Sequence, residues 1–216
     1  MTDAAPFDLA EVDRLLTTTR AVRRRLDLDR PVAREVMLDC LRIAVQAPTA
    51  SNGQTWRWVV VTDAGKRAEL ARLYSEAGAA YLKHAAEHEP DPQTKRVYES
   101  AVALTEILER VPVHVIPCMQ GRVEGTPNGV AASAYGSIMP AAWSFQLALR
   151  ARGLGSVWTT LHLFKEQEVA ELLGIPADVT QVALLPVAYT KGTDFRPAER
   201  GPVEEITSWD EWGRRP

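Results

Sequence analysis

Three polar stretches, far apart in the 216-residue sequence, carry side chains suited to bind a small anionic ligand. The first is the basic segment Arg20-Ala21-Val22-Arg23-Arg24. Guanidinium groups bind phosphate through paired, charge-assisted hydrogen bonds, so this segment is a candidate phosphate site. Taken alone, the segment fits a solvated basic turn better.

The second stretch is the loop Pro48-Thr49-Ala50-Ser51-Asn52-Gly53-Gln54-Thr55-Trp56, which joins a predicted helix to a predicted strand. Asn52 and Gln54 each offer a hydrogen-bond donor and an acceptor. Such groups match the pyrimidine edge and the ribityl hydroxyls of a flavin, although composition alone favours an ordinary capped turn. The third stretch begins at Arg200, beside a Gly-Pro bend that could direct this side chain toward an anion. By itself, Arg200 is no more than a surface arginine.

The elements that must position these residues form a helix-rich pattern with scattered strands. Apolar residues at helical spacing predict helices near residues 7–19, 31–47, 63–74, 81–88, 97–108, 131–149 and 165–173. Runs of β-branched and aromatic residues predict strands near residues 56–62, 113–119, 153–160 and 181–190. This order favours an α+β or mixed-sheet fold with helices on both faces. No internal repeat or linker appears, so residues 1–216 are predicted to form a single domain.

Two prolines affect these predictions. Pro117 indicates that its strand lies at an edge or ends early. Pro140 indicates either a kink or a late start in the apolar segment 131–149, and the pattern leaves this open. Because this segment carries no charge, we expect a helix buried in the core or at a subunit interface rather than in a membrane.

Composition narrows the function classes. The net charge of −3 argues against sequence-independent binding to nucleic acid, which needs a basic surface. Cys40 and Cys118 are expected to be buried thiols in a reducing cytosol rather than a disulfide. The first residues lack the basic and apolar regions of a secretory signal, so the expected location is cytoplasmic.

In their order and spacing, the three polar stretches and one further motif resemble the nitroreductase family. That family has an Arg-Ser-x-Arg-like turn, seen here as Arg20 to Arg23, and an Ala-Pro-Ser-x-x-Asn-x-Gln-Pro-Trp motif, seen here as Ala47 to Trp56. A Gly-Leu-Gly-Ser/Thr-x-Trp motif matches Gly153 to Trp158, and an Arg-x-Pro-x-Glu-Glu pattern matches Arg200 to Glu205. The resemblance covers nearly the whole chain, and the Ala-Pro-to-Trp motif is its most specific part.

The resemblance implies a nitroreductase-like three-layer α/β/α sandwich with a mixed, mainly antiparallel sheet. It also implies a homodimer that binds FMN at the subunit interface, with a C-terminal arm (residues 191–216) embracing the partner. The phosphate would be held by Arg20, Arg200 and either Arg23 or Arg24. The remaining cofactor contacts implied by the resemblance are Pro48, Thr49, Ser51, Asn52, Gln54, Trp158, Thr159 and Thr160.

This sequence departs from the family motifs at several positions. Ala21 replaces a serine that would contact the flavin phosphate or ribityl chain, and Thr55 replaces a proline. Thr49 replaces a serine but keeps the hydroxyl. The segment after Arg25 is longer than usual, which leaves open whether Arg23 or Arg24 reaches the flavin.

The implied activity is NAD(P)H oxidation by a ping-pong route, with hydride passing through the flavin to a nitroaromatic, a quinone or a similar small-molecule acceptor. No side-chain nucleophile is required, so no catalytic residue is assigned. Residues 74–110 would form a lid over the flavin, with Tyr81 and Tyr98 as candidate lid residues.

Three other interpretations fit parts of the sequence. His84, Glu87 and His88 match the H-x-x-E-H pattern of inverted zinc peptidases, but nothing selects the third protein ligand that zinc would need. A flavin-binding or flavin-consuming relative without reductase activity fits the changes at Ala21 and Thr55. A non-enzymatic dimeric interaction module would leave the loop of Asn52 and Gln54 without a purpose.

Overall fold

The structure, a computed structural model, describes residues 6–215 and divides them into two compact units. The core unit comprises residues 20–193, and the terminal unit groups residues 6–19 with residues 194–215. The terminal unit contains helix α1 (Leu9–Thr18) and the short 3-10 helix η4 (Val203–Ile206). The predicted arm therefore begins close to a unit boundary, and it groups with the N-terminal helix.

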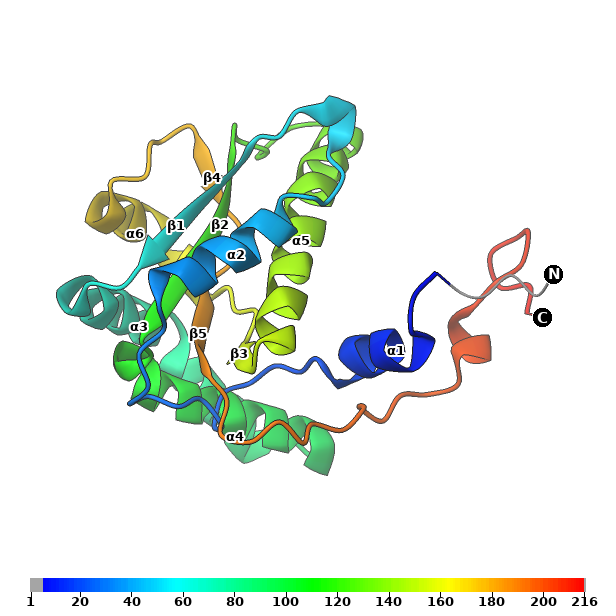
Figure 1. The fold of residues 1–216 in the computed structure, drawn as a ribbon, viewed down its shortest axis with the longest axis horizontal. Coiled ribbons are helices and arrows are strands. Elements are labelled where there is room, and N and C mark those ends of the chain that lie inside the picture. Colours follow the sequence, from blue (N-terminus) through cyan, green and yellow to red (C-terminus); the bar gives the residue numbers. More distant parts are fainter. Residues whose placement is uncertain (1–5, 216) are drawn as a thin grey trace. The chain divides into compact units, whose positions relative to one another are not determined.

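A five-stranded sheet forms the centre of the core unit (Figure 1). Its strands follow the order β1 (Trp56–Val61), β2 (Val113–Gln120), β5 (Leu185–Tyr189) and β3 (Leu154–Ser156), and β4 (Val179–Gln181) also pairs with β2. All pairings between these strands are antiparallel, and two isolated parallel bridges, Ala21–Ser156 and Gly121–Val179, accompany them. The predicted mixed, mainly antiparallel sheet is confirmed.

The prediction that Pro117 marks an edge strand or an early end is wrong. Strand β2 runs through Pro117 to Gln120 and is central, because β1 pairs on one side and β4 and β5 on the other. On that second side, β5 pairs with Val113–Val115 and β4 with Cys118–Gln120. The Pro117 carbonyl accepts from Val182 N in the interval between them, and Pro117, which has no N–H to donate, lies outside both ladders on this side.

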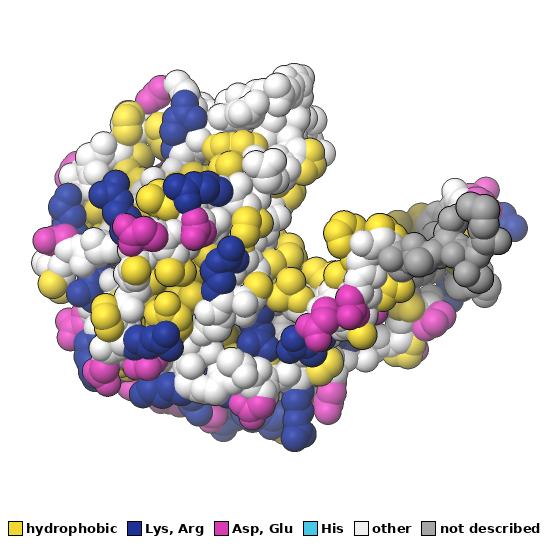
Figure 2. All heavy atoms as spheres, in the orientation of Figure 1, with side chains coloured by type: hydrophobic (Ala, Val, Ile, Leu, Met, Phe, Trp, Pro, Cys, Tyr) yellow, Lys and Arg dark blue, Asp and Glu magenta, His cyan; other side chains and the backbone are white. Residues whose placement is uncertain are grey.

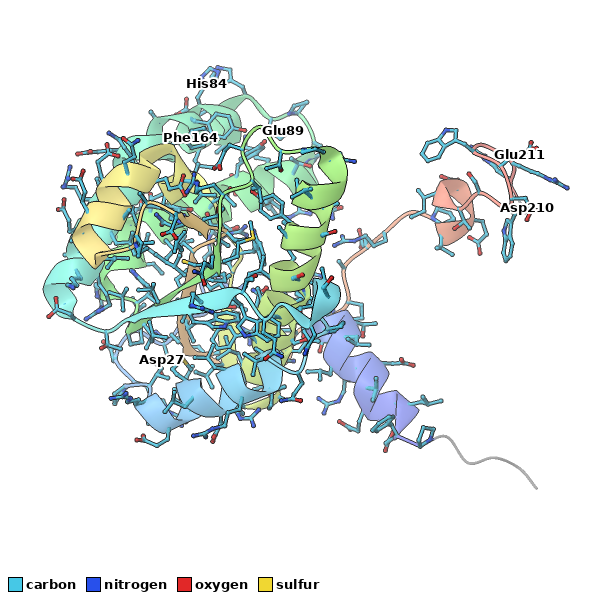
Figure 3. All side chains as sticks on the ribbon, turned by 90° about the horizontal axis from the view of Figure 1, so that it is seen from above. Asp27, His84, Glu89, Phe164, Asp210 and Glu211 are labelled. Atoms are coloured by element: carbon cyan, nitrogen blue, oxygen red, sulfur yellow. The ribbon has the colours of Figure 1, made fainter. Side chains whose placement is uncertain are left out.

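Helices cover both faces of the sheet, as predicted (Figures 1 and 3). On one face, α2 (Arg34–Ala44) and α5 (Asn128–Ala151) enclose a buried cluster with Val113 and Val115 of β2. The other layer contains α3 (Ala64–His88), α4 (Pro92–Ile107) and α6 (Glu166–Leu173). The core unit is therefore a three-layer α/β/α sandwich.

The segments predicted as separate helices at 63–74 and 81–88 form one helix, the 25-residue α3. The weakest helix former in its middle is Gly78, and a Cβ at that position would lie 2.5 Å from Leu161 Cδ2. Gly78 therefore allows a close approach rather than a break. The predicted lid boundary at residue 74 consequently lies inside a continuous helix.

Helix α5 begins at Asn128 and continues through Pro140 to Ala151, which settles the alternatives left open for that proline. Residues 128–149 carry no charged side chain. Even so, among the described residues no helix has the combined length and apolarity needed to cross a bilayer.

Both cysteines are buried free thiols, as expected. Burial raises the pKa of Cys118 to about 12 and also raises the pKa of Cys40. Since the thiolate is the reactive form, both side chains act as small apolar core residues.

Two buried histidines should make stability fall in mild acid. Burial lowers the pKa of both His114 and His162 to about 4, so each stays neutral in the folded state at pH 5. The unfolded chain, with ordinary histidine pKa values near 6.5, binds extra protons there. The free energy of unfolding should therefore drop as pH falls from about 6.5 to 4, by about 2–3 kcal/mol for each histidine.

Urea unfolding measured from pH 7 to pH 4 tests this expectation. The His162→Gln variant should show a shallower loss of stability over that range, because one titrating group is gone. An identical pH dependence for the variant and the wild type would contradict the assignment to His162.

Candidate functional site

The first predicted phosphate segment is held against the edge of strand β3. Ala21 forms a parallel bridge with Ser156, and Val22 N donates to Ser156 O over 2.9 Å. Val22 is buried, which anchors the backbone between Arg20 and Arg23 to the core unit. This approach needs a glycine in β3, since a Cβ on Gly155 would lie 2.8 Å from Val22 Cγ2.

The arginines of this segment differ in their surroundings. Arg23 points inward and donates from Nη1 to Ser100 Oγ of α4 over 3.1 Å, and burial lowers its pKa. Arg24 is exposed and lines a surface hollow between α3 and α4 together with Lys83 and Lys95. Arg20 is half-buried, and within residues 6–215 no hydrogen bond or ion pair to its guanidinium is found. Of these three arginines, Arg20 is therefore the one best placed to bind an anion.

The segment after β3 lies beside these arginines. Thr159 exchanges two backbone hydrogen bonds with Leu184, of 3.1 and 2.8 Å, and its Oγ1 lies 2.7 Å from the Tyr74 hydroxyl of α3. Trp158 packs against the buried clusters on the α2–α5 side of the sheet, and Thr160 is exposed. The structure thus brings the arginine segment close to the segment that carries Trp158–Thr160.

The Asn-Gln loop is a strained and exposed turn. Ser51, Asn52 and Gln54 adopt positive φ angles of 52°, 53° and 47°, which cost non-glycine residues about 1–2 kcal/mol each. The hydroxyl of Thr49 accepts from Gln54 N over 3.3 Å, and Gln54 Nε2 donates to Asn52 Oδ1 over 2.9 Å. All of these side chains except Thr49 are exposed, as is Pro48, so the loop presents amides and a hydroxyl outward.

Within a single core unit, the Asn-Gln loop and the arginine segment do not lie side by side (Figure 1). The loop is anchored to α5 by Ala50 N, which donates to Ser137 Oγ over 3.0 Å. The arginine segment reaches α5 through Ser156, whose Oγ accepts from Gln146 Nε2 over 2.9 Å. These anchor points are about 13 Å apart along the helix, and the loop extends toward the opposite end from the arginines.

The exposed side of α5 is apolar between these two groups. Met139 and Trp143 are each 43% exposed, and Gly136 and Pro140 lie in the same exposed stripe. Figure 2 shows apolar side chains exposed along this side of the core unit. The spacing of three, four and seven residues places this α5 stripe on one helix face.

Arg200 belongs to the terminal unit, whereas Arg20, Arg23 and Arg24 belong to the core unit. It is exposed, and its Nη1 donates to the neighbouring Glu199 carbonyl over 2.9 Å. Its predicted contact with the cofactor remains a prediction.

The histidine pair of the zinc reading lies at the exposed end of α3 (Figure 3). The rings of His84 and His88 are 4.1 Å apart between centroids, and His88 Nδ1 lies 2.8 Å from the His84 carbonyl. Over residues 6–215, no group of three or more potential metal ligands is found.

Three side chains near these groups were absent from the sequence prediction. Tyr74, Ser100 and Ser137 contact Thr159, Arg23 and Ala50, respectively. Ser137 also donates to Ser133 O of its own helix, which fixes its hydroxyl. No local pattern marks them, because each contact joins segments 77 or more residues apart.

Comparison with known proteins shows the family of the chain. The profile of the nitroreductase family matches residues 16–189, which is most of the chain. The chain belongs to the nitroreductase family. It is 30% identical to a Thermus thermophilus NADH dehydrogenase over 205 residues, covering 88% of this chain and 91% of the relative.

Other family relatives carry different names. The chain is 28% identical to 5,6-dimethylbenzimidazole synthase of Rhodospirillum rubrum over 190 residues, covering 86% of this chain and 82% of that enzyme. In fold it resembles an FMN-dependent nitroreductase of Mycobacterium smegmatis in complex with NADPH, with a TM-score of 0.70 and 22% identity. That match covers 94% of this chain and all of the other. The family is therefore clear, whereas its members differ in activity.

Proposed function

We propose that this protein is a homodimeric FMN-dependent NAD(P)H oxidoreductase that reduces an electron-poor acceptor such as a nitroaromatic or a quinone. The donor set supports FMN, because the half-buried guanidinium of Arg20, for which residues 6–215 show no partner, suits a phosphate, and the exposed amides of Asn52 and Gln54 suit a flavin. Family membership supports a flavin oxidoreductase in general.

The observation that carries the proposal is the separation of the two groups on either side of the α5 stripe. In a twofold dimer, the surface around this stripe meets its own copy. The arginine segment of one protomer then faces the Asn-Gln loop of its partner, and two equivalent sites are completed.

The candidate site residues would have different roles in binding FMN. Arg20 and Arg23, joined by Arg200, would hold the phosphate, and Arg24 on the outer side would contribute least. Trp158, Thr159 and Thr160 would line one side of the flavin, and Pro48, Thr49, Ser51, Asn52 and Gln54 of the partner would line the other. Bound FMN supplies the two-electron redox chemistry, while the protein binds, orients and excludes water.

The visible absorption spectrum of the purified protein tests this proposal, with chromatography of the released chromophore and the mass of the native assembly. We expect a yellow dimer carrying about one FMN per protomer, bleached by NADH or NADPH in the absence of air and restored by a quinone. A colourless protein that refuses added FMN would overturn the proposal.

The relation to 5,6-dimethylbenzimidazole synthase favours a second candidate, in which the flavin is consumed rather than cycled. The two functions differ in their products. Repeated bleaching and recovery with constant FMN supports the reductase, whereas loss of FMN with release of 5,6-dimethylbenzimidazole supports the synthase.

A further inference from the structure

Four side chains from four segments meet beneath the proposed flavin site. The Tyr74 hydroxyl of α3 lies 2.7 Å from Thr159 Oγ1, and Arg23 Nη1 donates to Ser100 Oγ of α4 over 3.1 Å. Tyr74 and Arg23 are close enough to interact electrostatically. Two segments of the proposed site are thus tied to each other through the α3–α4 layer.

Tyr74 is held as a neutral phenol. Its side chain is 2% exposed, and burial raises its pKa, against the smaller opposing effects of Thr159 and Arg23. The Arg23 guanidinium attracts the lone pairs of the phenol oxygen, which turns the phenol hydrogen away from the cation. The direction that remains is toward Thr159, whose hydroxyl oxygen accepts well.

We propose that Tyr74 is a positioning residue, which donates its phenol hydrogen to Thr159 and leaves the Thr159 hydrogen free to donate to the flavin. The inference rests on the proposed function, since Thr159 is assigned to the flavin only there. A Thr159 hydroxyl that is fixed as a donor favours the reduced flavin, which carries more negative charge than the oxidised form. Tyr74 would therefore influence the redox potential without touching the cofactor.

The Tyr74→Phe variant tests this inference because it removes the phenol hydroxyl and keeps the ring. We expect FMN to dissociate about three- to tenfold more readily, the usual effect of one hydrogen bond. The midpoint potential of bound FMN should become more negative, by about 30 mV for each tenfold change in the ratio of the two redox-state affinities. The Thr159→Val variant should show the same direction, and Thr159→Ser should restore wild-type values.

Two further variants test whether the effect is specific to the hydrogen bond between Tyr74 and Thr159. Tyr189→Phe is the matched control, because Tyr189 is half-buried, its ring lies 3.4 Å from the Arg30 guanidinium carbon, and it has no assigned role at the flavin. The double variant Tyr74→Phe/Thr159→Val should behave like either single variant, since both remove the same hydrogen-bond chain. Thermal unfolding of the apoproteins reports whether each variant folds.

The outcomes separate this inference from the proposed function. A wild-type protein that binds no FMN overturns both. If the wild type binds FMN and Tyr74→Phe leaves its affinity and potential unchanged, only the role of Tyr74 is overturned. A loss of thermal stability without a shift in potential, or additive effects in the double variant, would make Tyr74 a purely structural residue and would also overturn it.

Discussion

Replacing Trp143 with glutamate should convert the dimer into monomers and, at the same time, remove most of the bound FMN. Trp143 is 43% exposed on the α5 stripe, where no charged residue occurs between positions 128 and 149. A carboxylate buried without a partner costs about 3–5 kcal/mol, and twofold symmetry places two of them in one interface. The dimer dissociation constant should therefore rise by a factor on the order of 100 or more.

The mass of the native assembly and an FMN titration of the apoprotein measure this result. Val60→Glu is the matched control, because Val60 is also a partly exposed apolar residue but belongs to strand β1 rather than to α5. The control should remain dimeric and bind FMN normally. If the Trp143→Glu variant stays dimeric, the α5 stripe is not part of the dimer interface.

A third outcome would be equally informative. If Trp143→Glu becomes monomeric but keeps its FMN affinity, a single protomer holds the whole site. The proposed contribution of the partner's Asn-Gln loop to the site would then be contradicted, although the proposal that the protein binds FMN would be retained. The decisive measurement is therefore whether dimer formation and FMN binding are lost together, because a site shared between two protomers requires the dimer.

Local patterns in the sequence predicted most of the helices and strands well. The β-branched run after Trp56 and the glycine-led run before Trp158 each form a strand at the expected place. The helices on both faces of the sheet also follow from the order of helices and strands, whereas the three-layer sandwich was implied by the family resemblance. These features depend on residues close together in the chain, where propensity and periodicity act.

The failures came where distant segments decide the outcome. Pro117 is tolerated in a central strand only because β4 and β5 leave an interval beside it. Gly78 continues a helix because Leu161, 83 positions away, packs on it. Such contacts have no local signature in a single sequence.

The choice among the arginines shows the same limit at the candidate site. The pattern of residues 20–24 predicts a phosphate site but not which guanidinium faces it. Docking of Val22 on Ser156 directs Arg23 toward Ser100 and leaves Arg24 on the outer side. Tertiary packing, rather than motif spacing, therefore distinguishes these side chains.

Replacing Arg20 with alanine should weaken FMN binding by about 10- to 150-fold, the effect of losing charge-assisted hydrogen bonds worth about 1.5–3 kcal/mol. Arg20 is the half-buried arginine for which no partner is found within residues 6–215, so its removal leaves no internal hydrogen bond broken. Arg24→Ala, in the exposed hollow beside Lys83, should change the affinity by less than about threefold. Fluorescence titration of each apoprotein with FMN measures both.

Riboflavin provides the sharpest control, because it has the same ring and ribityl chain as FMN but no phosphate. If Arg20 binds the phosphate, Arg20→Ala should leave riboflavin affinity unchanged while FMN affinity falls to a similar level. Arg20→Lys should recover part of the difference, since an ammonium keeps the charge but not the planar fork. Equal losses for FMN and riboflavin would instead place Arg20 beside the ring or the ribityl chain, and the phosphate would have to be held by Arg23 or Arg200.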